Sequence, residues 1–498
     1  MAKDPVVLPH SFCTFLYPFH FRSEDFEIIA ASLKKDSFKG RPVWMPHTFQ
    51  NEDLLPHVAD FLNCPADEGA LAQKATVLSW DLQGEALGHH EFLGARCAWT
   101  CVHGKGERRL TLVFEVTEVN LTLFRIGIGF LHVQVRPETV APEVWQDFIH
   151  LFRFLEGSRS PVLQARRRVG KDQWEPCRPG LLPRGVPGAD EPDTFHMAEI
   201  VNTLLKRYLL VGSGSQAEIS ARLRSVYIKS QMIPYVGLFI NGYVEEHRMR
   251  LLNSMKNFFE SKQVLDPAPN DISPLNPDYL QYTSSSWFVF SLDGACFLAF
   301  DAPDTSFFKE NLPHHLARDQ YYLLFLLVQH QRLVLMGLSN EVAAYWGEQD
   351  PARRESLFDD LRDRLLFFTS NGYFHQVMQR EHHHRVYRMW QEKLQVHQLY
   401  SEVAGEVRDI HERSLLKVQE RTQKHADRLN NILFLLAPVS IALGLAQTIG
   451  SFIAAPVPAP HPALHLALQV GLGSVLVGFG LGLGIVMISL FFKRRSRK

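Results

Sequence analysis

One stretch of the chain places side chains that could handle ions at a regular helical spacing. The positions follow one another at alternating intervals of three and four residues, which keeps side chains on one face of a helix. They are Asn430, Leu433, Ala437, Ser440, Gly444, Gln447 and Ser451. Amide and hydroxyl oxygens are ligands suited to hydrated hard cations. This face, called the polar stripe below, is predicted to line a pore. The alternative is a packing seam of small residues that conducts nothing.

The polar stripe lies in a long segment without charged residues. Between Leu429 and Phe492 there is no Asp, Glu, Lys or Arg, whereas about 20 apolar residues suffice to cross a bilayer. Alternating prolines between Pro456 and Pro462 interrupt the segment, because they cannot continue a helix. We therefore predict a first transmembrane helix, an outer loop and a second transmembrane helix, over 431–455, 456–465 and 466–492. A buried helical hairpin inside a soluble body is the alternative.

Basic residues flank both predicted spans. Lys417, Arg421, Lys424 and Arg428 precede the first span and the basic tail 493–498 follows the second, while the loop has no basic residue. Cytosolic flanks of membrane helices carry the excess of Lys and Arg. We therefore expect a multi-pass protein of the plasma (inner) membrane with both termini in the cytosol. The lack of a signal sequence at the N-terminus agrees.

Glycines in the second predicted span recur at intervals of two and four residues. They are Gly478, Gly480, Gly482 and Gly484. Small residues four apart let helix backbones approach closely in lipid. This spacing predicts tight helix packing within an oligomer. The simpler alternative is that membrane helices tolerate glycine.

Histidines recur along the helix that is predicted to precede the membrane. His383, His397, His411 and His425 follow one another at intervals of two heptads. Imidazole nitrogens can bind zinc or respond to pH. Two heptads span about 21 Å of helix, so only different subunits could share an ion. These four residues are metal candidates, and a solvated helix face is the simpler interpretation.

The residues before the membrane segment are predicted to form a cytosolic α/β body on a long helical stalk. Runs rich in β-branched and aromatic residues dominate the first third, and helical patterns follow. We predict a cytosolic α/β domain over 1–313, antiparallel helices over 314–373 and a stalk helix over 374–430 that continues into the first span. Strand patterns include Phe12–Phe21 and Ser225–Asn241, and Asp350 before Pro351 predicts the start of a helix. Arg166–Pro192 is rich in Pro, Gly and Arg, which predicts a long surface loop or a disordered insertion.

The composition argues against several functional classes. The 498 residues carry a net charge of -1, so we expect no nucleic-acid partner. Six cysteines are too few for a disulfide-based scaffold. The sequence has no nucleophile–base motif, phosphate-binding loop or metalloprotease motif. We therefore expect no enzyme and no cofactor, apart from a divalent cation that is transported or regulatory.

This order of elements resembles the CorA family of divalent-cation channels, which includes the zinc-transporting ZntB branch. The resemblance covers about 314–498 and is most detailed in the first span. Pro438 and Gly444 match the proline and the glycine six residues later that family members commonly carry. The family's Gly-Met-Asn signature begins three residues after that glycine. Here those positions hold Gln447, Thr448 and Ile449, which is a departure from the family.

The resemblance implies a funnel-shaped homopentamer whose first span lines a central pore. It places Gln447, Thr448 and Ile449 at the outer mouth. The implied function is a channel or transporter that moves Mg²⁺, or Zn²⁺, Co²⁺ or Ni²⁺, across the membrane. The alternative is a membrane-anchored sensor or effector on the same scaffold. A cytosolic ligand or protein would gate it, and it would act on membrane integrity or signalling.

Overall fold

In the computed structural model the chain divides into two units, residues 1–407 and residues 408–498. The structure describes residues 4–38, 40–63, 75–83, 97–103, 110–157, 159–170, 173–176, 194–209, 228, 230–262 and 266–454, and then 470, 471, 473, 474, 478, 482 and 484. The predicted outer loop, Gly480 and the basic tail lie outside the described residues.

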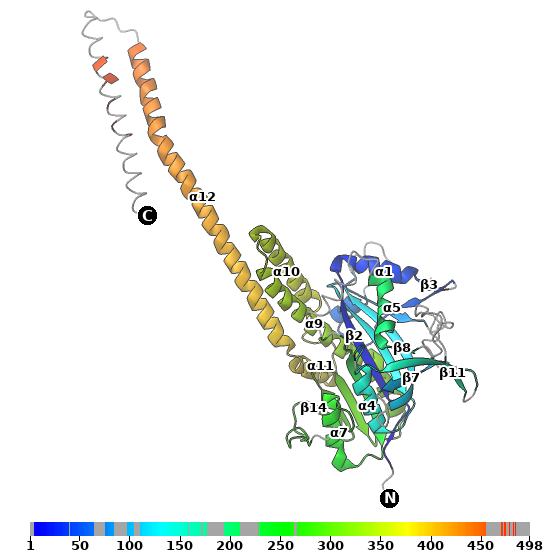
Figure 1. The fold of residues 1–498 in the computed structure, drawn as a ribbon. Helices are drawn as coiled ribbons and strands as arrows, with labels where there is room; N and C mark the ends of the chain where they lie inside the picture. The colour runs from blue at the N-terminus through cyan, green and yellow to red at the C-terminus, as the bar shows by residue number, and fades with distance from the viewer. Residues whose placement is uncertain are drawn as a thin grey trace, which may run out of the picture. The chain divides into compact units, whose positions relative to one another are not determined.

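A large mixed sheet forms the centre of the first unit (Figure 1). Its strands are β1 Val6–Val7, β2 Phe12–His20, β5 Trp44–His47, β6 Val77–Leu82, β7 Cys97–His103, β8 Leu110–Phe124, β9 Ile128–Pro137, β10 Val162–Arg168, β11 Trp174–Pro176, β12 Thr194–Phe195, β13 Ile233–Asn241, β14 Tyr279–Thr283, β15 Ser286–Phe290 and β16 Ala295–Phe300. The main path runs β11-β10-β7-β8-β9-β2-β13-β16-β15-β14. Among the described strands only β13 and β16 pair in parallel. A separate hairpin joins β3 Ser37–Phe38 to β4 Arg41–Pro42.

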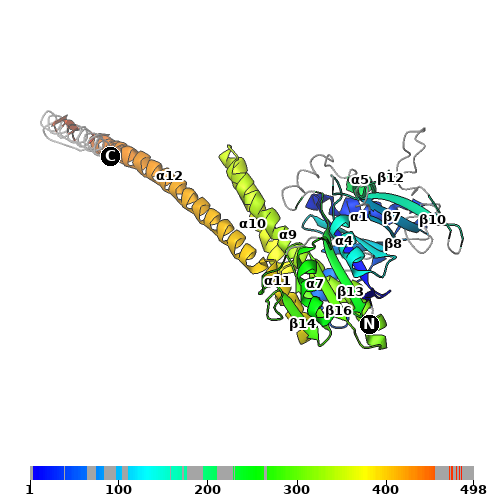
Figure 2. The same ribbon diagram turned by 60° about the horizontal axis from the view of Figure 1, so that its bottom comes forward.

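Helices cover both faces of this sheet (Figure 2). Four of them share one core with the sheet: α1 Phe26–Lys35, α4 Pro142–Phe152, α5 Met197–Leu209 and α7 Glu245–Asn257. The opposite face meets α9 Tyr321–Trp346 and α11 Glu381–Lys393, and a short helix, α2 Pro56–Leu62, lies beside β6. A strand buried on both faces needs apolar residues at nearly every position. The buried run from Ile233 to Ile240 in β13 meets this requirement.

The helices predicted over 314–373 belong to the same unit as the sheet. Helix α9 begins at Tyr321, after a π-helical turn, Phe307–Asn311, a short helix, α8 Leu312–His314, and a second π-helical turn, His315–Asp319. Helix α10, Pro351–Asn371, begins as predicted, because the Asp350 carboxylate accepts a hydrogen bond from the Ala352 amide at 3.0 Å. Within the described part of the chain, the helix that is long and apolar enough to cross a membrane is Phe307–Trp346. Because 78% of its apolar window is buried in the body, we assign it to the core.

The segment predicted as one stalk helix, 374–430, is interrupted. Helix α11 ends at Lys393, and α12, Val396–Ala454, begins three residues later. Gln395 between them has a left-handed backbone, with φ at 54°. Leu394 and Val396 are both buried, yet residues two apart point to different sides of a continuous helix. The break lets both side chains reach the body. From Val396 to Ala454 the helix is continuous, as predicted for the passage into the first span.

The beginning of the stretch predicted as a loop, Arg166–Pro192, is instead part of the sheet. Strand β10 continues to Arg168 and pairs with β11 in antiparallel fashion. Strand β10 lies between β11 and β7, so Arg166 and Arg167 are paired on both sides. Residues 177–193 of the same stretch lie outside the described residues.

A buried amide network holds α9 and α11 together. The side-chain nitrogen of Gln331 donates to the Gly372 carbonyl and to the Tyr387 hydroxyl, both at 3.0 Å. Its oxygen accepts from Gln391 at 3.0 Å. Gln329 on the same helix is equally buried, but its amide has no hydrogen-bond partner among the described residues.

These two glutamines form a matched pair for a stability test. Gln331→Leu should lower the free energy of unfolding by about 1–3 kcal/mol, because it leaves buried partners unsatisfied. Gln329→Leu should be neutral or stabilising, because it removes a buried amide that lacks partners. Urea unfolding of the full chain in detergent measures both. Equal losses for the two variants would contradict the network.

Candidate functional site

The polar stripe lies entirely on α12. The described side chains of the stripe are exposed: Asn430, Leu433, Ala437, Ser440, Gly444 and Gln447. The Ser440 hydroxyl donates to the Leu436 carbonyl of its own helix at 3.1 Å. Its lone pairs remain available to a second group. Ser451, Thr448 and Ile449 are part of the same helix, but their side chains lie outside the described part of the chain.

The apolar residues of α12 around the stripe are exposed as well. Ile432, Leu433, Phe434, Leu436, Ile441 and Leu443 are between 47% and 64% exposed. Consecutive helix residues point about 100° apart, so the exposed run from Ile432 to Phe434 covers much of the circumference. The described part of α12 beyond its first turns therefore exposes apolar side chains around much of the helix.

The glycines of the second predicted span are described at three positions. Gly478, Gly482 and Gly484 are helical. A side chain built at any of them would meet nothing within 4 Å. The described residues show no packing partner at these positions, and the predicted packing face stays a prediction.

The four candidate histidines do not share one helix face. His383 is on α11, where it is buried and its Nε2 atom lies 2.9 Å from the Gln320 side-chain oxygen. Burial lowers the pKa of His383 to about 4. His397, His411 and His425 are exposed on α12, beyond the break at Gln395. In the described part of the chain, no three His, Cys, Asp or Glu residues are grouped to hold a metal ion.

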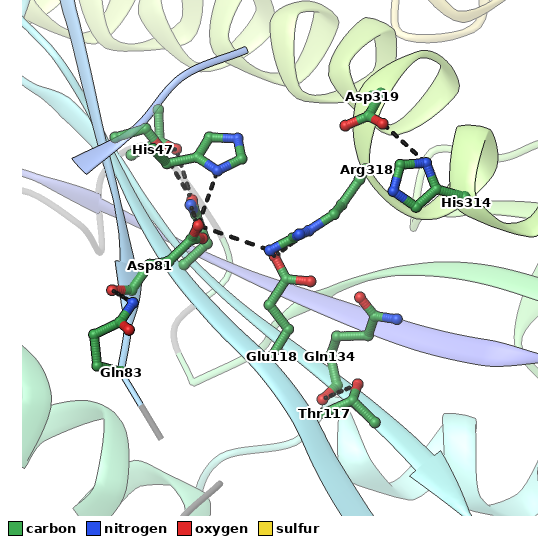
Figure 3. Close-up of polar contacts among 12 residues, drawn as sticks. His47, Asp81, Gln83, Thr117, Glu118, Gln134, His314, Arg318 and Asp319 are labelled. Carbon is green, nitrogen blue, oxygen red and sulfur yellow. Dashed lines mark hydrogen bonds and ion pairs between the residues drawn. The ribbon is translucent and has the colours of Figure 1, made fainter. Parts of the chain in front are cut away.

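A charged cluster that sequence reasoning missed joins the sheet to the turn before α9 (Figure 3). Arg318 on the π-helical turn contacts Glu118 of β8, with 2.9 Å from Nε and 2.8 Å from Nη2 to the same carboxylate oxygen. The same Nη2 atom lies 3.7 Å from the Asp81 carboxylate of β6. Asp81 also accepts hydrogen bonds from His47 and Asn120, both at 3.0 Å.

These contacts keep the cluster charged. Burial acts to raise the pKa of Asp81, but the hydrogen bond and charge of His47, together with Asn120 and Arg318, lower it overall. Asp81 and Glu118 are therefore two carboxylates that share one guanidinium. This arrangement fixes Arg318 and the turn that carries it to the sheet. Chemically it is an ion-pair network, with no nucleophile beside a base.

A β-bulge places Glu118 in this cluster. The β8–β9 register shifts between Val116 and Glu118, where Thr117 is the extra residue. Val116 belongs to the core beneath α4, as do Val119 and Leu121. Because side chains alternate between the two faces of a sheet, one extra residue moves every following side chain to the opposite face. Glu118 and Asn120 therefore point toward Arg318, opposite to the core. Polar residues at two-residue spacing, Glu118, Asn120 and Thr122, were the signal in the sequence.

Next to this cluster are buried polar atoms without partners. His132 of β9 is opposite Asn120, and Gln134 is opposite Glu118. Among the described residues, neither ring nitrogen of His132 has a hydrogen-bond partner. The side-chain oxygen of Gln134 has none either. Burial lowers the pKa of His132 to about 4, with Glu118 acting in the opposite direction. His132 is therefore neutral at pH 7.

Comparison of the chain with protein-family models, curated proteins and solved structures finds no match.

The buried His132 predicts how stability responds to acid. Its pKa is about 4 in the folded chain and about 6.5 when unfolded. Between these values the unfolded chain binds more protons, so stability falls as the pH drops below 6.5. At pH 5 this group lowers the free energy of unfolding by about 2 kcal/mol.

When the pH is lowered from 7.5 to 5, the free energy of unfolding of His132→Leu should therefore fall by about 2 kcal/mol less than that of the wild type. Chemical unfolding at the two pH values measures the difference. His425→Leu, on the exposed part of α12, is the control and should keep the wild-type pH dependence. An unchanged pH dependence in His132→Leu would show that this histidine is accessible to protons in the folded chain.

Proposed function

We propose that the chain assembles into an oligomeric membrane channel or transporter for divalent cations, with the polar stripe of α12 facing the lumen. The observation that carries the proposal is one continuous helix, Val396–Ala454, that begins on the α/β body and ends in a charge-free segment. Its first turns are packed, because Val396, Val403 and Val407 are buried. Farther along, apolar side chains are exposed around the helix. An oligomer in a lipid bilayer accounts for both the packed first turns of α12 and its exposed apolar remainder.

The polar stripe supports the choice of ions as cargo. Polar groups in hydrocarbon are costly, so they face a lumen or another helix. Ser440 and Gln447 offer neutral oxygens, which can contact the water shell of a cation. The stripe has no carboxylate, so attraction for divalent ions comes from dipoles alone. The resemblance to the CorA family, including Pro438 and Gly444, points to the same class of cargo and to a pentamer.

A second candidate function is a membrane-anchored sensor or effector. Two observations favour it. The neutral residues Gln447 and Thr448 stand where the CorA family has its signature. The α/β body is also large, and it carries a partly exposed ion-pair cluster around Arg318 that a simple anchor does not need. In that case a cytosolic ligand or protein would control opening, and ion selectivity would be low.

Topology is the first test of both candidates. Reporters fused to the N-terminus, inserted in the 456–465 loop and fused to the C-terminus should place only the loop outside the cytosol, because basic residues flank the spans on the cytosolic side. Protease protection of the same sites provides an independent measurement. A cytosolic loop, or termini on opposite sides, would exclude a hairpin and with it the lumen.

Ion flux tests the stripe itself. Ser440→Leu puts a ring of bulky apolar side chains into the lumen of an oligomer, and uptake should fall to the level of empty liposomes through steric filling and dewetting. Gln447→Asp adds a ring of carboxylates, and the half-saturating concentration of Mg²⁺ or Zn²⁺ should fall several-fold. Uptake in liposomes at matched protein density measures both.

Leu435→Ile and Leu436→Ile, which are off the stripe, are the matched controls and should conduct like the wild type. Comparison of Mg²⁺, Zn²⁺, Co²⁺, Ni²⁺ and Na⁺ separates the two candidates, since a channel for divalent ions should prefer them over Na⁺. Equal uptake by the wild type, Ser440→Leu and Gln447→Asp would remove this face as the conduction path.

A further inference from the structure

Four aromatic and imidazole rings gather where the segment after α10 meets the first turns of α12. Tyr373 and Tyr400 stack with ring centroids 4.4 Å apart and planes within 17°. His375 and His397 have centroids 5.9 Å apart and planes within 12°. Both histidines are exposed. The sequence separates them by 22 positions, so periodicity along one helix could not pair them.

The spacing of the two imidazoles fits a shared metal ion. Zinc–nitrogen bonds are about 2.0–2.1 Å long. Two imidazole rings bound to one ion through ring nitrogens therefore have centroids roughly 5–6.5 Å apart. The observed 5.9 Å lies inside this range. The two rings are stacked, with planes within 12° of parallel, so one ring must rotate before a lone pair of each points at the same ion. His375 is exposed, which leaves its side chain room for that rotation.

Tyr373 is positioned to orient one of the rings. Its hydroxyl oxygen lies 2.6 Å from His397 Nδ1. When Nδ1 carries the proton and donates to this oxygen, the Nε2 lone pair is available to a metal. Histidine ligands of metals commonly donate a hydrogen bond from the N–H group of their second ring nitrogen. Tyr373 is in turn held by its stack on Tyr400. Tyr373 is therefore a positioning residue, because it contacts the ligand His397 and does not contact the ion.

The surroundings of His397 act against the charged form of its imidazole. Burial and the neighbouring His375 lower the pKa of His397, while Glu392 raises it and Arg388 lowers it.

We propose that His375 and His397 form a binding site for one borderline transition-metal dication, of which Zn²⁺ is the probe. The described residues provide no group of three ligands, so water completes the coordination. Structural zinc sites use four protein ligands, whereas this site exchanges its ion with solvent. A bound ion links the segment between α10 and α11 to the first turn of α12. The proposal does not depend on the proposed function of the membrane segment.

Calorimetric titration of the full chain in detergent with Zn²⁺ tests the site. The tightest class of sites should hold one Zn²⁺ per chain, and His375→Ala or His397→Ala should weaken it at least tenfold. The double variant His411→Ala/His425→Ala, on the exposed part of the same helix, should bind like the wild type. Wild-type affinity in both single variants, or loss of the site in the control, would overturn the proposal.

Two further arms separate this site from a general histidine effect. Tyr373→Phe should weaken Zn²⁺ binding about tenfold, the lower end of what loss of an outer-shell partner costs, whereas a purely structural Tyr373 would leave the affinity unchanged. Mg²⁺ in large excess should not displace Zn²⁺, because Mg²⁺ prefers oxygen ligands. Displacement by Mg²⁺ would contradict an imidazole site. No ion gradient is involved, so failure of transport leaves this result unaffected.

Discussion

Burial of both faces of the central sheet is the constraint on which the structure of the body depends. A strand covered by helices on each side has no solvent to receive its polar side chains, so each one needs a partner. The strands satisfy this mostly with apolar residues, as in β13. Polar side chains do occur on the strands, as where Glu118 and Asn120 meet Arg318 and Asp81. The neighbouring His132 and Gln134 have buried polar atoms without a hydrogen-bond partner among the described residues. Arg318 and Glu118 keep 37% and 17% of their side-chain surface exposed. This partly buried pair ties the turn before α9 to β8 by direct contact.

The same constraint explains why the turn before α9 is so closely tied to the sheet. Helix α9 is apolar on nearly all sides and is buried against β9 and α11. It has no charged face of its own at its start to fix its rotation, and the charge comes from Arg318, which precedes it. On α11 the amide network around Gln331 and Tyr387 has a similar role. Hydrogen bonds and charges thus determine the register of helices whose apolar contacts alone would tolerate rotation.

The sequence predicted the parts of this fold that depend on local pattern. The strands containing Phe15 and Val236, the Asp350 cap and the uninterrupted passage into the charge-free segment all follow from periodicity and capping chemistry. The break at Gln395 could not be predicted, because it contains neither Gly nor Pro and arises only from burial of Leu394 and Val396. The bulge at Thr117 was also missed, because no Gly or Pro marks it in the sequence. Contacts far apart in the sequence decide both features. The predicted pore residues remain a prediction, because their environment depends on copies of the chain or on lipid.

The histidines show how such a break changes the chemistry that a sequence suggests. Two-heptad spacing groups His383 with His397, but the left-handed turn at Gln395 separates them and brings His397 beside His375 instead. Burial then divides the histidines into two kinds. His132, His330 and His383 are buried, and burial lowers their pKa values, so they serve as neutral packing groups. His375 and His397 are exposed, and an exposed imidazole can exchange water for a metal ion at little cost. Exposure together with a matched neighbour, and not spacing along the helix, therefore selects the histidines that can bind an ion.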